Sequence, residues 1–357
     1  MDLPMKHIAW TSLFLLAALA SPAPAQLLPR PYAVDRLNGK LKGQILDFTN
    51  NHAKDQRFYS AALCEKRDVY VYLPPGYDPK KQYPMGVFLH GFLSDERGFL
   101  QELLKPLDDA IACGKLPPMI VVAPDGTVKG RAFLANYGTF FLNTNLGKFE
   151  DYIVCDIYDW MMKTFSVRPE PEAHFILGVS MGGQGAFTLP MKHPDKFRVC
   201  MGIMPPLNML YTSCRDRYMD NFDPCCWKQR TEPGSSWEIV GQFYGVLLIT
   251  QGHLIHPMYG KNNPETLELM RRDNPLDLLD SRDVQPGQFE FFVAYVGKDD
   301  FNLDAQAESF IYRAKQKCLP ITVRSLPNRH HGRAPARLFL PDAIEWLNEK
   351  LSKFRPE

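Results

Sequence analysis

The amino-acid sequence predicts a doubly wound α/β fold, in which a mainly parallel sheet carries helices on both faces. Two observations support this prediction. Short runs that are apolar at nearly every position, as in strands covered on both faces, begin at Met85, Met119, His174, Phe197, Phe289 and Ile321. Helix-like segments lie between these runs, and strands that alternate with helices form parallel sheets. A ligand in such a sheet binds beyond the carboxyl ends of the strands.

The N-terminal residues have the pattern of a secretory signal peptide. Lys6 and His7 precede an apolar stretch over 8–20, and Ala23-Pro24-Ala25 forms an A-x-A cleavage site before Gln26. The apolar stretch is shorter than the roughly 20 residues that span a bilayer, so a retained anchor is the weaker interpretation. We expect 1–25 to be a signal peptide, 26–66 a leader, and the mature protein to be secreted or periplasmic without a membrane span.

Three further segments show periodicity. Residues 67–79 alternate and end in Pro and Gly, which predicts an edge strand and its turn. Residues 149–165 place apolar side chains on one helical stripe, and 340–354 form a closing helix with a proline in its first turn. We therefore expect the domain to cover 67–357.

The charge balance limits the classes of partner. Lys and Arg number 41 and Asp and Glu number 40, so no overall field attracts nucleic acid or an anionic membrane. A small-molecule or polysaccharide-linked substrate is the simpler expectation. Oligomeric state has no signature in the sequence.

Residues 209–288 are longer than a single crossover requires, and we expect an insertion packed over the active-site edge. A surface elaboration without a role in substrate choice is the alternative. Cys214, Cys225 and Cys226 crowd into this stretch, which predicts at least one disulfide in an exported protein. A zinc site would need paired ligand spacings that the stretch lacks. Cys155 and Cys200 are expected to be buried thiols.

The sequence Gly178-Val179-Ser180-Met181-Gly182 follows a predicted buried strand and opens a predicted helix. A sharp strand-to-helix turn presents the serine hydroxyl in a strained conformation, and it needs flanking glycines because side chains would collide there. The backbone N–H groups that follow can bind a developing oxyanion. The context therefore predicts Ser180 as a nucleophile.

A serine nucleophile needs a base, and the base needs an orienting acid. Asp299 and Asp300 end one apolar strand, and His330 and His331 follow the next. Both pairs lie where a strand leaves the sheet toward the edge that carries Ser180. The order of serine, acid and histidine along the chain is the one that this type of serine turn requires.

From about Asp68 to Leu351 the chain resembles the esterase branch of the α/β-hydrolase family, which includes feruloyl esterases, S-formylglutathione hydrolase and the mycolyltransferases. The segments that carry the resemblance are FLHGF (88–92), GVSMGGQGA (178–186), HPDKF (193–197), DNPLDLL (273–279), GKDDFNLDAQAESF (297–310) and RHHG (329–332). They are specific for the fold and for serine-based acyl chemistry, but not for a substrate.

The resemblance implies a catalytic triad of Ser180, Asp299 and His330, with Asp300 and His331 as the alternatives. It also implies an oxyanion hole from the backbone N–H groups of Phe92 and Met181, whereas His90 is expected to brace the loop before Phe92. No metal or organic cofactor is required for this chemistry.

The predicted function is that of a secreted serine carboxylic ester hydrolase that forms an acyl-enzyme, acting on acylated or feruloylated polysaccharide. An acyltransferase, a serine peptidase and a non-catalytic binding module are the alternatives. The aromatic segment 135–145 either lines an acyl pocket or belongs to the core.

Overall fold

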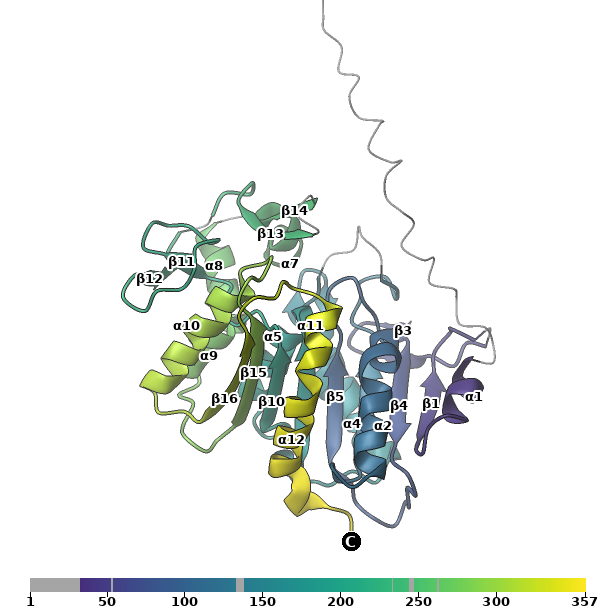
Figure 1. Ribbon diagram of the computed structural model, residues 1–357. Coiled ribbons are helices and arrows are strands. Elements are labelled where there is room, and N and C mark those ends of the chain that lie inside the picture. The colour runs from purple at the N-terminus through teal and green to yellow at the C-terminus, as the bar shows by residue number, and fades with distance from the viewer. Residues whose placement is uncertain (1–32, 53, 133–137, 233, 244–246, 262) are drawn as a thin grey trace, which may run out of the picture.

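The computed structural model describes residues 33–357 except 53, 133–137, 233, 244–246 and 262. The predicted signal peptide lies outside the described residues. A central sheet of eight strands has the order β1-β4-β6-β5-β9-β10-β15-β16 (Figure 1). The strands are β1 (Gln44–Phe48), β4 (Val69–Leu73), β5 (Met85–Leu89), β6 (Ile120–Pro124), β9 (His174–Val179), β10 (Val199–Ile203), β15 (Glu290–Val296) and β16 (Ile321–Leu326).

The prediction of a mainly parallel sheet is confirmed. The six strands from β6 to β16 pair in parallel, and each contains one of the apolar runs seen in the sequence. Only β1 and β4 run antiparallel to their neighbours. The carboxyl ends of the six parallel strands therefore meet at one edge, as the sequence implies for the site.

The prediction of an edge strand within 67–79 is wrong. β4 is buried at all five positions because β1, from the segment expected to be a leader, pairs with it from Gln44↔Leu73 to Phe48↔Val69. Asp108 on α2 (Leu104–Ala112) holds the start of β1, since its carboxylate accepts the backbone N–H groups of Lys42 and Gly43 at 2.9 and 2.7 Å. This part of the leader thus belongs to the sheet.

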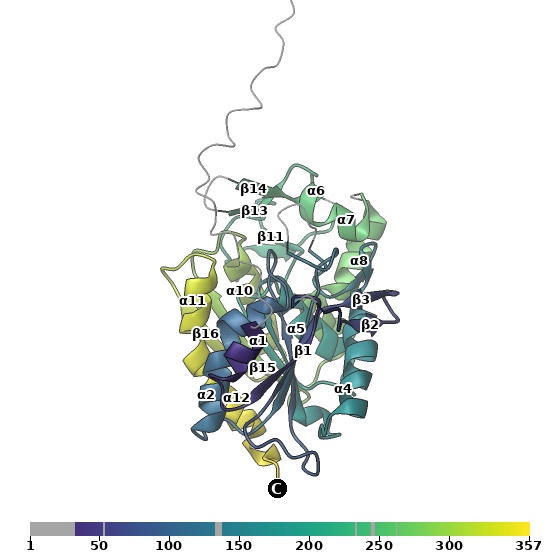
Figure 2. The same cartoon turned by 90° about the vertical axis from the view of Figure 1, so that its right-hand side faces the viewer.

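Helices cover both faces of the sheet (Figures 1 and 2). One face carries α1 (Ala33–Asn38), η1 (Phe99–Leu103), α2, α11 (Arg333–Leu338), α12 (Leu340–Leu351) and η4 (Ser352–Phe354). The other carries α3 (Phe149–Asp151), η2 (Tyr152–Ile157), α4 (Tyr158–Thr164), α5 (Met181–Lys192), α8 (Pro264–Asp273), α9 (Pro275–Ser281) and α10 (Leu303–Gln316). The predicted helix over 149–165 thus forms with a π-helical segment in its middle, and η3 (Pro171–Ala173) leads into β9.

Successive strand residues point to opposite faces and build two cores. On β15, Phe291 and Val293 belong to the buried cluster that contains side chains of α5 and α10, whereas Phe292 and Ala294 belong to the cluster that contains side chains of α12 and α2. Both sets are buried, so side chains on both faces of the strand must be apolar, and the strand sequences are continuous apolar runs. Cys200 is buried as expected, but Cys155 is exposed because it lies on the outer side of η2.

The first part of the expected insertion, 209–260, forms a distinct group of elements above the carboxyl ends of the strands (Figure 1). The group contains the hairpins β11 (Tyr211–Ser213) with β12 (Trp227–Gln229) and β13 (Ile239–Phe243) with β14 (Leu247–Thr250), then α6 (Gln251–Leu254) and α7 (His256–Tyr259). Cys214 and Cys226 form a disulfide across the first hairpin, which confirms a bridge in this stretch. Helices α8 and α9 then return to the main layer and α9 packs on α5.

Two short hairpins complete the fold: β2 (Phe58–Ser60) with β3 (Glu65–Arg67), and β7 (Asn143–Thr144) with β8 (Gly147–Lys148). Within the described part of the chain, no helix combines the length and the apolar character needed to cross a membrane.

Substitution of Phe187, which lies on α5, tests the packing of the core on that face of the sheet. Its buried ring stacks on Phe291 at 5.6 Å and meets Phe310 edge-on at 5.4 Å. We expect Phe187→Ala to lower the free energy of unfolding by about 3 to 5 kcal/mol, measured by urea denaturation, because it removes a buried ring and leaves a cavity. Tyr59→Ala, at a side chain that is 60% exposed, serves as the control and should change it by about 0.5 kcal/mol or less. A loss below about 1 kcal/mol for Phe187→Ala would contradict this packing.

Candidate active site

Ser180 occupies the turn between β9 and α5. Its φ of 52° and ψ of −120° are unusual for a residue with a side chain, and such strain is typical of functional sites. The turn is possible because its flanking residues are glycines. A Cβ on Gly178 would lie 2.0 Å from the Gly182 carbonyl oxygen, and a Cβ on Gly182 would lie 2.1 Å from that of Leu89. The glycines of the motif are therefore required by close packing of α5 against β9 and β5.

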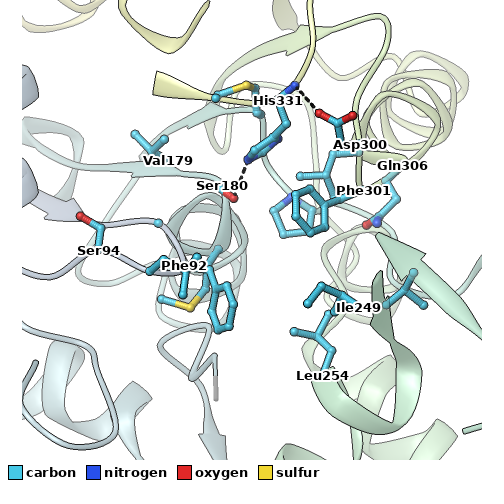
Figure 3. Close-up of a pocket in the computed structure, with 18 of the residues that line it drawn as sticks. Phe92, Ser94, Val179, Ser180, Ile249, Leu254, Asp300, Phe301, Gln306 and His331 are labelled. Atoms are coloured by element: carbon cyan, nitrogen blue, oxygen red, sulfur yellow. Dashed lines mark hydrogen bonds between the residues drawn. The ribbon is translucent and has the colours of Figure 1, made fainter. Parts of the chain in front are cut away.

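An imidazole lies between the Ser180 hydroxyl and a carboxylate. Nε2 of His331 is 3.0 Å from Oγ of Ser180 (Figure 3). Nδ1 of the same ring is 2.8 Å from Oδ2 of Asp299. The carboxylate can only accept, so Nδ1 carries a proton and donates it. Nε2 of the neutral ring is then the acceptor for the Ser180 hydroxyl. The Asp299 side chain is fully buried, and its Oδ1 accepts the backbone N–H of Phe301 at 2.9 Å.

The structure does not bring His330 to Ser180, contrary to the sequence prediction. The side chain of His330 is 68% exposed, and its Nδ1 lies 3.1 Å from Oδ1 of Asp300. The side chain of His331 is 12% exposed and faces the serine. Two consecutive side chains in an irregular loop point in different directions, so only one of them reaches Ser180. The sequence contained both histidines but no signal that distinguishes their orientations.

Asp299, rather than Asp300, contacts the imidazole that faces Ser180. Asp300 instead accepts the backbone N–H of His331 through Oδ2 at 3.2 Å, as Figure 3 shows, and pairs with His330 through Oδ1. The second carboxylate thus holds the backbone of the histidine loop. The sequence placed both aspartates at this edge but assigned no contact to Asp300.

The electrostatic surroundings raise the pKa of His331. Burial alone would lower this pKa by disfavouring the charged ring, but the negative charge of Asp299, its hydrogen bond to Nδ1 and the charge of Asp300 together outweigh burial. The ring is therefore a stronger base than an isolated histidine. Its neutral form, which can accept a proton from Ser180, becomes populated only at a correspondingly higher pH.

Phe92 and Met181 lie next to Ser180, where the sequence places the oxyanion hole. Met181 is the first residue of α5, and Phe92 follows the loop that leaves β5. This loop passes close to the nucleophile, since a Cβ on Gly91 would be 3.4 Å from Cβ of Ser180. His90 braces the loop as expected, since its Nδ1 lies 2.9 Å from the carbonyl oxygen of Gly91. Its buried ring accepts the N–H of Gly126 at Nε2, 2.9 Å away, and burial lowers its pKa, which keeps the ring neutral.

Ser180 opens into a cavity of about 1430 Å³. The insertion contributes apolar side chains to the lining, among them Met209, Val240, Ile249, Leu254 and Ile255. Polar and charged side chains from the insertion and from the rest of the domain also line it, among them Arg230, Glu238, Glu102, Asn328, Arg329 and Arg333. The insertion thus lines the space beside the serine. Phe140, from the segment 135–145, both lines the cavity and belongs to the core, whereas 135–137 lie outside the described residues.

A family model described as "Putative esterase" matches residues 60–333. The chain belongs to this esterase family. A curated relative, the endo-1,4-beta-xylanase/feruloyl esterase of Xylanibacter ruminicola, is 25% identical over 158 residues, which cover 42% of this chain and 21% of that protein. The chain therefore spans about a fifth of the length of this curated relative.

Solved structures of esterases share the fold. A ferulic acid esterase superposes with a TM-score of 0.62 at 16% identity, over 87% of this chain and 99% of that chain. An S-formylglutathione hydrolase from Agrobacterium tumefaciens superposes with a TM-score of 0.59 at 18% identity, over 87% of this chain and 96% of that chain. At these identities the likeness establishes the α/β-hydrolase fold, in agreement with the sequence prediction.

The charge of Asp300 should contribute to the basicity of His331 in this esterase-family site. We expect Asp300→Asn to lower the pKa of His331, measured by NMR titration of isotope-labelled histidine, because a neutral amide no longer favours the imidazolium. Asp299→Asn should lower it further, since Asp299 contributes both charge and a hydrogen bond. Asp283→Asn, at an exposed position between α9 and β15, is the charge-matched control. An unchanged His331 titration in both test variants would show that these carboxylates do not set the pKa.

Proposed function

We propose that this chain is a secreted serine carboxylic ester hydrolase with Ser180 as nucleophile, His331 as general base and Asp299 as orienting acid. The observation that carries the proposal is the continuous hydrogen-bonded series from the Ser180 hydroxyl through His331 to Asp299. Membership of the esterase family supports the reaction class. The N-terminal signal pattern supports export.

The geometry supports a two-step reaction. Ser180 Oγ attacks the ester carbonyl carbon while Nε2 of His331 takes the hydroxyl proton, and the Asp299 carboxylate stabilises the imidazolium. The backbone N–H groups of Phe92 and Met181 stabilise the tetrahedral oxyanion. His331 then protonates the departing alcohol and leaves an acyl-enzyme.

Water completes the cycle. His331, neutral again, removes a proton from a water molecule that attacks the acyl carbonyl, and then returns the proton to Ser180. Both steps need the neutral imidazole at their start. Activity should therefore decline as the pH falls through the raised pKa of His331.

The substrate we propose is an acyl or feruloyl ester of a polysaccharide. The apolar side chains that the insertion contributes to the cavity suit an acyl group, and polar lining residues such as Arg329 and Arg333 suit a hydroxyl-rich alcohol. The curated relative carries xylanase and feruloyl esterase in its name, which supports this substrate class.

Alanine variants of the two histidines test the assignment directly. We expect Ser180→Ala and His331→Ala to lower kcat on p-nitrophenyl acetate by about 10⁴-fold or more, because either change disables the nucleophile and base as a unit. His330→Ala should retain activity within about tenfold, because its ring is exposed and pairs with Asp300 rather than with Ser180. Loss of fluorophosphonate labelling in Ser180→Ala, with labelling kept in His330→Ala, gives a second measurement.

The reverse ranking of the two histidines would refute the role of His331, and full activity of Ser180→Ala would refute the reaction itself. Release of ferulate and acetate from feruloylated and acetylated xylan, compared with hydrolysis of a fluorogenic peptide, tests the substrate class. Added sugar acceptors separate hydrolysis from acyl transfer by their product ratio.

A further inference from the structure

The acid loop, defined here as Asp299–Asn302, has His331 on one side and the insertion on the other. On one side Asp299 contacts the His331 ring and Asp300 contacts the His331 backbone. On the other side the loop is bonded to residues of the insertion at three places. This loop is therefore the physical connection between the insertion and the candidate base.

The hydrogen bonds at these three loop residues come from two separate parts of the insertion. The Tyr218 hydroxyl donates to the Phe301 carbonyl at 2.8 Å, and the Asn302 amide donates to the Tyr218 carbonyl. From strand β13, the backbone N–H of Gln242 donates to the Asp300 carbonyl at 3.0 Å. Tyr218 is itself fixed, because its hydroxyl accepts a bond of 2.6 Å from Gln306 on α10.

The Phe301 ring forms a fourth connection, through packing. It meets the His331 imidazole edge-on, with ring centroids 5.2 Å apart and an interplanar angle of 72°. Its other side lies so close to β13 that a Cβ on Gly241 would be 2.1 Å from the ring. The ring therefore occupies the space between the insertion and the imidazole (Figure 3).

The backbone of the acid loop needs external support. Asn302 has a φ of 55° and a ψ of 30°, in the left-handed region that asparagine tolerates better than most residues but at some cost. Its side-chain amide, which is buried, is used entirely on the insertion, at the carbonyls of Tyr218 and Asp220. A conformation of this kind persists where surrounding contacts hold it.

We propose that the insertion positions the base of the proposed triad, with Tyr218 and Phe301 as positioning residues that keep Asp299 and His331 aligned on Ser180. This inference rests on the proposed function, because it assigns a role through His331. It gives the insertion a part in the acyl-transfer step itself, in addition to lining the cavity.

Tyr218→Phe tests the proposal by removing one hydroxyl. It leaves the Phe301 carbonyl and the Gln306 amide without this partner, and the loss of a buried hydrogen bond of about 1 kcal/mol corresponds to roughly fivefold. We expect kcat for p-nitrophenyl acetate to fall by about threefold to tenfold while KM changes little, because the short acyl group does not need the insertion wall. The acid limb of the pH profile should move to lower pH, since a looser Asp299 contact lowers the pKa of His331.

Tyr211→Phe is the matched control. Tyr211 lies in the same insertion, is also buried, and donates its hydroxyl to the Asn221 carbonyl at 2.8 Å rather than to the acid loop. It does not line the cavity. Both variants should lose similar stability in thermal unfolding, but only Tyr218→Phe should change kcat and the pH profile.

Gly241→Ala is a second substitution that perturbs the acid loop, this time from strand β13. Gly241 does not line the cavity, and its new methyl group would press on the Phe301 ring. We expect a reduced kcat on the acetyl ester and slower fluorophosphonate labelling of Ser180, with the fold retained by circular dichroism. If Gly241→Ala does not fold, Tyr218→Phe with its control still decides the question.

The outcomes separate this inference from the proposed function. If Tyr218→Phe is folded and keeps the wild-type kcat and acid limb, the positioning role is overturned even though His331→Ala is inactive. A change confined to KM for long acyl esters would also overturn it, because it would assign Tyr218 to the cavity wall alone. If His331→Ala keeps full activity, the proposed function fails first.

Discussion

The close approach of α5 to β9 and β5 is the constraint on which the site depends. The turn at Ser180 can form only because Gly178 and Gly182 allow backbone atoms to approach within distances that a Cβ would forbid. This packing ends the central strand abruptly, starts a helix at once, and leaves the serine hydroxyl above the carboxyl edge of the sheet. The other groups of the site are arranged around that fixed point.

The acid and the base reach this point from the two strands at the far side of the sheet. β15 and β16 pair in parallel over six residue pairs, so the loops that follow them leave the sheet side by side. Asp299 and His331 are 32 positions apart in the chain, yet lie in hydrogen-bond contact for this reason. The parallel register therefore supplies the proximity, and the loops determine which side chain of each pair is used.

The insertion lines the cavity and contacts the acid loop as one structural unit. Its apolar side chains line the cavity beside Ser180, while Tyr218 and strand β13 hold the acid loop. A substrate that packs against the insertion would thus contact the same elements that support the base. The disulfide between Cys214 and Cys226 closes the first hairpin of this unit and restricts its unfolded states.

The sequence by itself determined the fold class, the nucleophile turn and the edge at which the site lies, because apolar periodicity and glycine spacing are local properties of the chain. It did not determine that β1 covers β4, since strand pairing depends on contacts between distant segments. It also favoured His330 over His331, whereas the structure places His331 against Ser180. Neighbouring residues in an irregular loop have the same sequence context, and only packing against Asp299, Phe301 and Ser180 turns the His331 ring inward. That choice belongs to the tertiary structure.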